Sequence, residues 1–475
     1  MSHERASYKR IILCADGTWL ASDQGGTEEP SNVARIARMI ANDGTDADGK
    51  IVPQIVSYHS GLGAGELPLE KTISGSFSGE GSIGWGLDTQ VCEIYEFVSD
   101  NYSPGDEIFF FGFSRGAFTV RSVVGLISDV GVLSSQHMSY FAEMWKAYRE
   151  NTNGEPFSKT VWYQQHKDML RLEDVRIKVV GVWDTVGSLG IPEWPLVNLA
   201  SKVGIALNKK YEFHNTKVSK NVDLAFQALA IDERRLTFPP TLWHKTANAP
   251  AKELQQCWFP GVHGDIGGGA KNREITDIAF AWMVDNLSGM LAFEEVVVDD
   301  LIQQHQDARA KRISADHLGD NSWGCGPIVS NFAGVEGAFF RVLGVQDRTP
   351  GNYPPTQGQQ PETRDTNESF HPIVRVRKTI LTSQYRPAAL TGYTFERPKG
   401  PQGARAGWYW DKKGMAPAIP EFVLRPEKKL LVANGTGYAY RDSLSRTMCP
   451  EHLLVDLDQD NGVADSLTTK RNGRV

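Results

Sequence analysis

The chain has 475 residues and a formal net charge of −7, with 40% hydrophobic and 23% charged residues. These proportions are typical of a globular protein, and the length exceeds what one compact core usually holds, which predicts one large domain with additions or two domains. The negative charge argues against a nucleic-acid binder, which needs a basic surface. The five cysteines lie far apart and none forms a CxxC pair, so we expect no disulfide framework, no metal site and no cofactor.

The first residues, Met-Ser-His-Glu-Arg, do not resemble a signal peptide. They are polar and run into a predicted strand, and no apolar run in the chain is long enough to span a bilayer. We therefore expect a cytoplasmic protein, with secretion by a route that needs no signal peptide left open.

Short apolar runs alternate with helical patterns along the first part of the chain. The apolar runs predict buried strands over residues 11–15, 51–58, 108–111, 175–182 and 254–259. Apolar residues at helical spacing predict helices over residues 87–101, from residue 117 onward, and over residues 274–286 and 292–311. Strands that alternate with helices predict an α/β fold with a mostly parallel central sheet flanked by helices.

The segments between these elements have no clear pattern. Residues 186–225 show no clear strand and are predicted to form a cap, while residues 229–234 resemble the end of a helix. Residues 348–364 are rich in Pro, Gly, Gln and Thr, which predicts a loop. Residues 395–420 have no periodicity from which an element can be predicted.

The residues Gly112-Phe113-Ser114-Arg115-Gly116 match the G-x-S-x-G pattern of a nucleophile elbow. In that motif the serine lies on a sharp turn between a strand and a helix, and the flanking glycines let the two elements approach without a clash. A buried strand is predicted directly before the motif and a buried helix directly after it. We therefore predict that Ser114 is a catalytic nucleophile, although a plain glycine-rich turn is the alternative.

A serine hydroxyl needs a base to take its proton, and position must select that base among eleven histidines. His263 follows the predicted strand 254–259 and lies in a loop closed by three glycines. His59 precedes the serine, which is the wrong chain order for this kind of elbow, and His214 follows no predicted strand. His371 is a distant alternative. We predict that His263 is the base.

The acid of such a triad should follow a strand that lies between the nucleophile and the base in the chain. Asp184 fits best because it ends the predicted strand 175–182, and its role would be to orient the imidazole and stabilise its protonated form. Asp232 is the alternative, although its segment resembles a helix end. Asp265 is only two residues from His263 and is expected to shape the loop.

An oxyanion hole needs two backbone N–H donors. The elbow supplies the N–H of Arg115, and the second donor should come from the loop after an early strand. Gly17 or Thr18 occupies that place in the sequence. A simple turn in which Asp16 caps a helix is an equally good explanation of the same loop.

Five sequence blocks around these residues resemble the DUF2235 family of uncharacterised α/β-hydrolases, which includes the type VI secretion phospholipase effectors of the first lipase class. The order and spacing of the blocks make this resemblance more specific than G-x-S-x-G alone, and it covers about residues 8–290. It implies a Ser/Asp/His triad and, for the members that act as effectors, hydrolysis of lipid esters. The blocks are residues 16–19, 112–117, 182–187, 230–235 and 258–269.

The predicted architecture is α/β-hydrolase-like, with a cap insertion and a C-terminal extension. Residues 1–290 are expected to form the catalytic domain, with the possible cap at 186–225. Residues 291–390 are expected to continue that domain with helices. Residues 391–475 form a C-terminal extension of unknown role.

We expect a serine esterase or lipase that cleaves carboxylic esters, with a lipid or phospholipid as substrate, through an acyl-enzyme. Trp194 follows the predicted acid among apolar residues and prolines, and we expect it to contact substrate at a membrane surface. An ordinary packed connection is the alternative for that segment. An immunity or secretion partner is expected if the chain is an effector.

Two other functions are compatible with the sequence. Asp16, His263 and Asp265 could be the ligands of a metal-dependent hydrolase, although two acids and one histidine are a weak ligand set. A non-catalytic binding module on a hydrolase fold is also possible, because a fold alone does not determine a function. Sensitivity to chelators would identify the first alternative, and failure of a fluorophosphonate to label Ser114 would favour the second.

Overall fold

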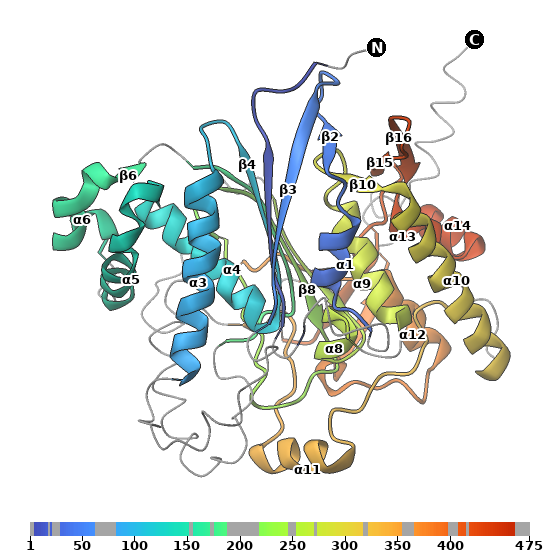
Figure 1. Ribbon diagram of the computed structural model, residues 1–475. Coiled ribbons are helices and arrows are strands. Elements are labelled where there is room, and N and C mark those ends of the chain that lie inside the picture. The colour runs from blue at the N-terminus through green and yellow to red at the C-terminus, as the bar shows by residue number, and fades with distance from the viewer. Residues whose placement is uncertain are drawn as a thin grey trace.

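A computed structural model describes most of the chain around one large sheet (Figure 1). The described residues are 4–17, 20, 29–61, 82–151, 155–171, 175–187, 218–245, 253–269, 273–316, 322–353, 365–397, 407–414 and 418–460. Within these residues, none of the helices is both long enough and apolar enough to cross a membrane.

The central sheet is mostly parallel, as the sequence predicted. Its strands are β1 (Arg10–Ala15), β2 (Asp43–Thr45), β3 (Ile51–His59), β4 (Glu107–Phe113), β7 (Ile177–Trp183), β8 (Val222–Ala230), β9 (Glu253–Phe259) and β11 (Glu368–Phe370). Their order across the sheet is β11-β9-β8-β7-β4-β1-β3-β2, and all neighbours are parallel except β2 and β3. The α/β fold of the hydrolase type is therefore confirmed.

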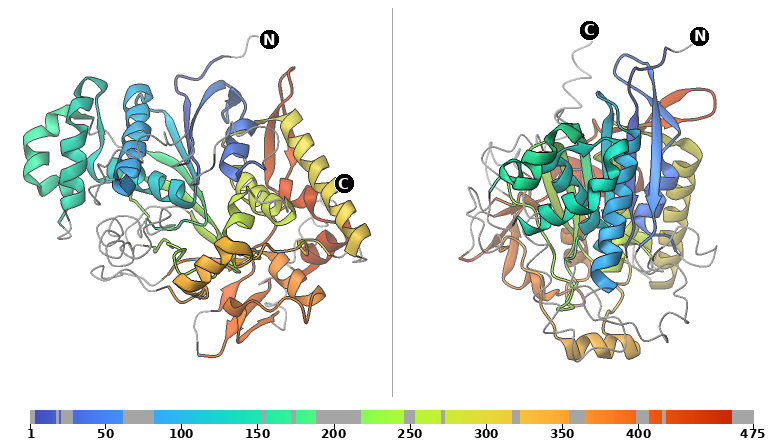
Figure 2. Two further views of the ribbon diagram at one scale, coloured as in Figure 1. Left: turned by 60° about the horizontal axis from the view of Figure 1, so that its bottom comes forward. Right: turned by 60° about the vertical axis from the view of Figure 1, so that its left-hand side comes forward.

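Helices lie on both sides of this sheet (Figures 1 and 2). On one side lie α3 (Ser82–Asn101), α4 (Ser114–Val130), α5 (Phe141–Glu150) and α6 (Val161–His166), with the short pair β5 (Val132–Leu133) and β6 (Leu170–Arg171). On the other side lie α1 (Asn32–Met39), α9 (Arg273–Asp285) and α10 (Glu295–Asp316).

The strand before Ser114, β4, has a continuously apolar sequence because both of its faces are buried. Successive side chains of a strand point to opposite faces of the sheet. Ile108 and Phe110 of β4 join the hydrophobic cluster that includes α3 and α4, whereas Phe109 and Phe111 join the cluster that includes α1 and α9. All four side chains are fully buried, so β4 has no solvent-facing side to which polar residues could be assigned.

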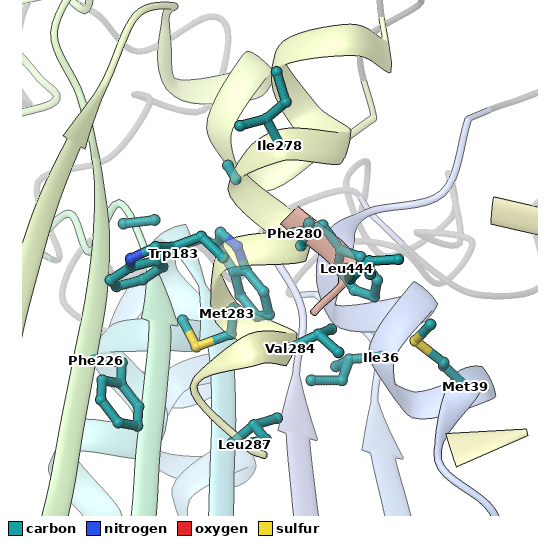
Figure 3. Close-up of a cluster of buried hydrophobic side chains, with 14 of the residues drawn as sticks. Ile36, Met39, Trp183, Phe226, Ile278, Phe280, Met283, Val284, Leu287 and Leu444 are labelled. Atoms are coloured by element: carbon teal, nitrogen blue, oxygen red, sulfur yellow. The ribbon is translucent and has the colours of Figure 1, made fainter. Parts of the chain in front are cut away.

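The C-terminal part of the chain packs against the same core. Figure 3 shows Leu444 of α13 (Leu444–Met448) beside Phe280 and Val284 of α9. Ser443, which caps α13, donates a hydrogen bond from its Oγ to the buried carboxylate of Asp285 at 2.8 Å. The division of the chain at residues 290 and 390 remains a prediction, but residues on both sides of each point share one hydrophobic cluster.

The later elements extend the sheet and add small sheets of their own. After β9 the chain forms the short helix α8 (His263–Gly267), then α9, β10 and α10. It then passes through α11 (Gly334–Leu343) and reaches β11 at the sheet edge. Strand β10 pairs in parallel with β15, and β12, β13 and β14 form an antiparallel meander. The remaining bounds are β10 (Ala292–Glu294), α12 (Pro372–Ile380), β12 (Tyr393–Glu396), β13 (Tyr409–Lys412), β14 (Ile419–Pro420), β15 (Lys429–Ala433), β16 (Tyr438–Asp442) and α14 (Glu451–Asp460).

Two local predictions were wrong, and both concern β8. The segment 186–225 was predicted to hold no strand, and residues 229–234 were taken for a helix end, but β8 runs through Val222–Ala230. This strand contains three alanines and a glutamine, which favour helix locally, and its pairing with β7 and β9 overrides that preference. Most of the predicted cap, residues 188–217, lies outside the described residues.

Candidate active site

Ser114 lies where β4 ends and α4 begins, in a strained conformation. Its φ angle is +57°, a region that residues other than glycine rarely adopt. The residue is 6% exposed and is the first residue of α4. Strain of this kind at a strand-to-helix turn is the geometry of a nucleophile elbow.

The two glycines of the motif are required by close backbone contacts. A Cβ atom on Gly112 would lie 2.6 Å from the Cα atom of Ala117, and one on Gly116 would lie 2.2 Å from the carbonyl oxygen of Ala15. Any larger residue would push α4 away from β4 and β1. The elbow geometry therefore depends on both glycines.

His263 and Asp184 form a direct buried hydrogen bond. The Nδ1 atom of His263 donates to the Oδ2 atom of Asp184 at 2.6 Å, and both residues are buried. His263 is the first residue of α8, after β9, and Asp184 follows β7, so the ends of two parallel strands supply the pair. The structure thus brings together the base and the acid that the sequence predicted.

Aromatic rings hold the imidazole beside the elbow. The ring of His263 packs on that of Phe113, the residue before Ser114, with 4.6 Å between centroids. Phe238 contacts the imidazole edge-to-face at 5.0 Å. A Cβ atom on Gly267 would lie 1.9 Å from the ring of Phe113, which explains the glycine at the end of α8.

A buried glutamate fixes the backbone of His263. The N–H of His263 donates to the Oε2 atom of Glu233 at 3.2 Å, and Asn331 donates its Nδ2–H to the same oxygen at 2.6 Å. Arg235 forms an ion pair with Glu233 at 2.8 Å. Burial raises the pKa of Glu233, but the hydrogen bond and charge of Arg235 outweigh it and hold the pKa below its usual value.

Asp184 is held by four donors, two of them from a distant arginine. The Nη1 and Nη2 atoms of Arg348 donate to its two carboxylate oxygens at 3.3 and 3.0 Å, and the N–H of Ala230 donates at 3.1 Å. Burial raises the pKa of Asp184, but the charge of Arg348 and the hydrogen bond from His263 lower it by more, so the pKa is below its usual value. Asp184 is therefore an anion that can stabilise an imidazolium.

The alternative acid, Asp232, has other partners. Its Oδ2 atom accepts hydrogen bonds from the N–H of Gly261 at 2.7 Å and from the hydroxyl of Tyr385 at 3.0 Å. Asp265 lies in α8 and accepts from the N–H of Val262 at 3.0 Å, so it caps the start of that helix. Neither carboxylate has a hydrogen bond to the imidazole of His263 in the described part of the chain.

The loop after β1 is tied together by Asp16. Its carboxylate accepts hydrogen bonds from Ser31 Oγ at 2.5 Å, Tyr58 Oη at 2.7 Å and the N–H of Gly17 at 2.7 Å. The Gly17 N–H thus has a carboxylate partner. Among the described residues, no group of three or more His, Cys, Asp and Glu side chains could hold a metal ion, so Asp16, His263 and Asp265 do not form the postulated site.

Some of the remaining candidates from the sequence lie in the described part of the chain, and others do not. His371 is fully buried and caps α12, where its Nδ1 accepts from the N–H of Ile373 at 3.4 Å. Arg115 is the second residue of α4. Thr18, Trp194 and His214 lie outside the described residues.

Sequence reasoning did not find Arg348 or Glu233 as site residues. Glu233 lies in a block that carried the family resemblance, which was the available signal. Arg348 lies at the start of a segment predicted to be a loop, 164 positions from Asp184, and no local pattern marks it.

Comparisons with known proteins identify a family for most of this chain. A family model described as the type VI secretion system phospholipase effector Tle1-like catalytic domain matches residues 9–286. The uncharacterized protein YEL023C of Saccharomyces cerevisiae is 29% identical over 202 residues, which are 40% of this chain and 28% of that protein. The chain therefore spans just over a quarter of that curated relative.

Two solved structures are similar over part of the chain. The Tle1 effector bound to the VgrG spike of the type 6 secretion system is 20% identical and has a TM-score of 0.29, over 57% of this chain and 52% of that one. An uncharacterized protein from Pseudomonas aeruginosa is 16% identical and has a TM-score of 0.32, over 59% of this chain and 45% of that one.

Proposed function

We propose that this chain, which belongs to the family of Tle1-like phospholipase effectors of type VI secretion, cleaves a carboxylic ester of a phospholipid through an acyl-enzyme on Ser114. The family model covers the residues that contain β1 to α9, and it makes the chain a lipase-type hydrolase. The proposal adds the three residues that carry out the reaction, namely Ser114, His263 and Asp184.

The observation that carries the proposal is the 2.6 Å hydrogen bond between His263 and Asp184 next to the elbow. The imidazole of His263 packs on Phe113, and the next residue is Ser114 at a φ of +57°. A strained serine, a histidine and a buried carboxylate on the ends of parallel strands are the arrangement that acyl transfer requires.

In the first half of the reaction, Ser114 Oγ attacks the carbonyl carbon of the ester, and Nε2 of His263 takes the hydroxyl proton. Asp184 stabilises the imidazolium through Nδ1. The N–H of Arg115 is the proposed first donor to the oxyanion. The second donor comes from the loop that contains Gly17 and Thr18, and Thr18 is the better candidate because the N–H of Gly17 already donates to Asp16. The C–O bond of the ester then breaks, and the imidazolium gives its proton to the departing alcohol oxygen.

In the second half, water hydrolyses the acyl-enzyme. His263 takes a proton from the water as its oxygen attacks the acyl carbon, and the proton then passes to Ser114 Oγ as the fatty acid leaves. The reaction consumes one ester and one water and produces one alcohol and one acid. The chain's own residues supply every proton transfer.

The test compares wild type with Ser114→Ala on p-nitrophenyl esters and on phospholipid vesicles. We expect loss of about 10⁴–10⁶-fold in rate, because the covalent intermediate cannot form. Ser122→Ala is the matched control, since Ser122 lies on the same helix, one turn beyond Phe118, and its hydroxyl donates to the carbonyl of Phe118. A fluorophosphonate should label wild type and the Ser122 variant but not the Ser114 variant.

Near-normal hydrolysis by Ser114→Ala would contradict the nucleophile assignment. Labelling of Ser114 without hydrolysis of any ester would leave a reactive serine and reject the proposed substrate. Absence of both labelling and hydrolysis would favour the binding-module alternative.

Contact with a membrane and with a secretion partner belongs to the same proposal. We expect the rate to rise when the substrate aggregates, and to fall on Trp194→Ala, if that segment admits lipid from a surface. We also expect the chain to be exported by a type VI apparatus, so its appearance in the medium should stop when the apparatus is inactivated. A rate that ignores aggregation would restrict the substrate to dispersed esters.

A further inference from the structure

A cavity of about 410 Å³ lies at the end of β8, and one of its lining residues, Arg348, contacts Asp184. This volume is within the range of small-molecule sites, about 300–1,000 Å³. Arginines from three separate segments of the chain converge on it. Its charged lining residues are Asp232, Arg234, Asp347, Arg348, Arg377 and Arg386.

Arg348 connects this cavity to the triad. It is 3% exposed, lines the cavity and donates two of its five N–H groups to Asp184. Among the described residues, its other N–H groups have no hydrogen-bond acceptor. A buried guanidinium with unused donors at a cavity wall can bind a further anionic oxygen.

Arg377 is a second buried cation and has no carboxylate within ion-pair distance among the described residues. It is 5% exposed, and its Nη1 donates to the carbonyls of Gly324 at 2.8 Å and Gly326 at 2.6 Å. Its guanidinium lies over the ring of Tyr385 at 4.7 Å, and its Nε has no partner. Buried charges are usually paired, so this arrangement favours an anion from outside the chain.

The two carboxylates of the cavity do not balance its arginines. Asp347 forms an ion pair with Arg234 at 2.6 Å. Asp232 accepts from a backbone N–H and a tyrosine hydroxyl, and burial raises its pKa to about 6. Arg386, which is exposed at the rim, has no carboxylate partner in the described part of the chain. The cavity therefore has a surplus of positive charge.

We propose that this cavity binds a phosphate group through Arg348, Arg377 and Arg386. The planar guanidinium fork matches two phosphate oxygens, and several forks from different segments suit the tetrahedral anion. The phosphate can belong to a lipid headgroup or to a free phosphate ester. The headgroup assignment rests on the proposed phospholipid substrate, whereas phosphate binding itself does not.

The direct test is calorimetric titration of the full chain with inorganic phosphate and with glycerol 3-phosphate, at constant ionic strength. We expect saturable binding of at least one of them. Arg386→Gln should weaken it roughly tenfold, since one charge-assisted contact is lost. Arg425→Gln is the matched control, because Arg425 is also an exposed arginine and its ion-pair partner Glu427 is exposed as well. This variant should leave phosphate binding unchanged.

The two sources of the phosphate are separated by kinetics. If the site holds a headgroup, glycerol 3-phosphate should raise the KM for phospholipid without changing that for p-nitrophenyl butyrate, and Arg386→Gln should raise the phospholipid KM alone. If the site holds a free phosphate ester, the ligand should change the rates on both substrates alike. Either result supports the site.

Absence of saturable binding by both ligands would overturn the inference, as would equal weakening by Arg386→Gln and Arg425→Gln. Binding by a chain that hydrolyses no ester would leave the phosphate site in place and reject the proposed function. Hydrolysis through Ser114 without phosphate binding would do the reverse. The two proposals can therefore fail separately.

Discussion

The region matched by the family model and the region after it reach the candidate site in different ways. In residues 9–286, Ser114 and Asp184 directly follow parallel strands and His263 follows β9 after a short turn, and the carboxyl ends of such strands meet at one edge of the sheet. Arg348 and Arg377 belong to the later region and reach the same edge from segments outside those strands. The proposed reacting groups thus come from the sheet, and the arginines around them come from the later region.

The comparison is tested most strongly by Asp184→Asn. We expect a loss of about 10⁴-fold in kcat, because the amide cannot stabilise the imidazolium and favours the wrong tautomer of His263. Asp232→Asn should keep the rate on p-nitrophenyl butyrate within about tenfold, because Asp232 contacts Gly261 and Tyr385. The measurement is kcat on that neutral ester, with thermal midpoints of both variants.

The opposite ranking of these two variants would assign the acid to Asp232. If Asp184→Asn fails to fold because Arg348 loses its counterion, His263→Gln provides the second measurement. That variant leaves the pair of Arg348 and Asp184 intact and should lose a comparable rate.

A substitution that loosens the packing of the later region should have a smaller effect, on the free energy of unfolding. Because the core is shared, this effect should extend to the whole core. Leu444 is fully buried in the cluster beneath α9, so Leu444→Ala should lower the free energy of unfolding by about 2–5 kcal/mol. Val455→Ala is the control on the same C-terminal segment, because Val455 is 48% exposed. Urea unfolding followed by far-UV dichroism measures both.

If Leu444→Ala splits the unfolding curve into two transitions, the later region unfolds by itself. A single shifted transition would indicate that both regions form one cooperative unit.

Much of the sheet and the proposed triad could be predicted from sequence because the signals are local. The continuous apolar run of β4 predicts burial on both faces, and the change of period after Gly116 predicts α4. The strand-end positions of Asp184 and His263 then predict their meeting, which the 2.6 Å hydrogen bond confirms. The catalytic roles of these residues stay predictions until activity is measured.

Other features could not be predicted because they depend on distant contacts. Strand β8 was missed, since its alanines favour helix until β7 and β9 pair with it. β11 has only three residues and is a strand because β9 lies beside it. Arg348 is 164 positions from Asp184, and nothing near it in sequence indicates a carboxylate partner.

Arg348→Lys separates charge from geometry at the junction of the two regions. Lysine keeps the charge but loses the two-pronged contact with Asp184, so we expect roughly tenfold lower kcat with little change in KM for p-nitrophenyl butyrate. Burial alone would raise the pKa of Asp184, and Arg348 is the largest opposing influence. A weaker contact should therefore raise that pKa and move the acidic limb of the rate profile to higher pH.

The matched control for this variant is Arg375→Lys. Arg375 makes a similar contact with Glu421, with Nε and Nη2 donating at 3.0 and 2.9 Å, but away from the triad. It should leave the rate profile unchanged. A rate profile of Arg348→Lys that coincides with wild type would show that Arg348 only stabilises the fold.

An effect on stability rather than on rate is expected for Asp265, which lies in α8 with His263. Burial, and to a smaller extent the carboxylate of Asp232, raise the pKa of Asp265 to about 7. The folded state therefore holds this proton more tightly than the unfolded chain, so the contribution to stability is present below about pH 4 and is lost as the pH rises through 7.

Asp265→Asn keeps an acceptor for the N–H of Val262 but cannot titrate. Between pH 4 and 7 the free energy of unfolding of wild type should fall by at most about 1.4 kcal/mol per pH unit because of this proton. Asp265→Asn should not show this part of the fall. Urea midpoints across this range, with exposed Asp442→Asn as control, measure the difference. Parallel curves for Asp265→Asn and wild type would mean that Asp265 is ionised in the folded protein. Loss of esterase activity in Asp265→Asn at pH 7 would assign Asp265 a role in catalysis.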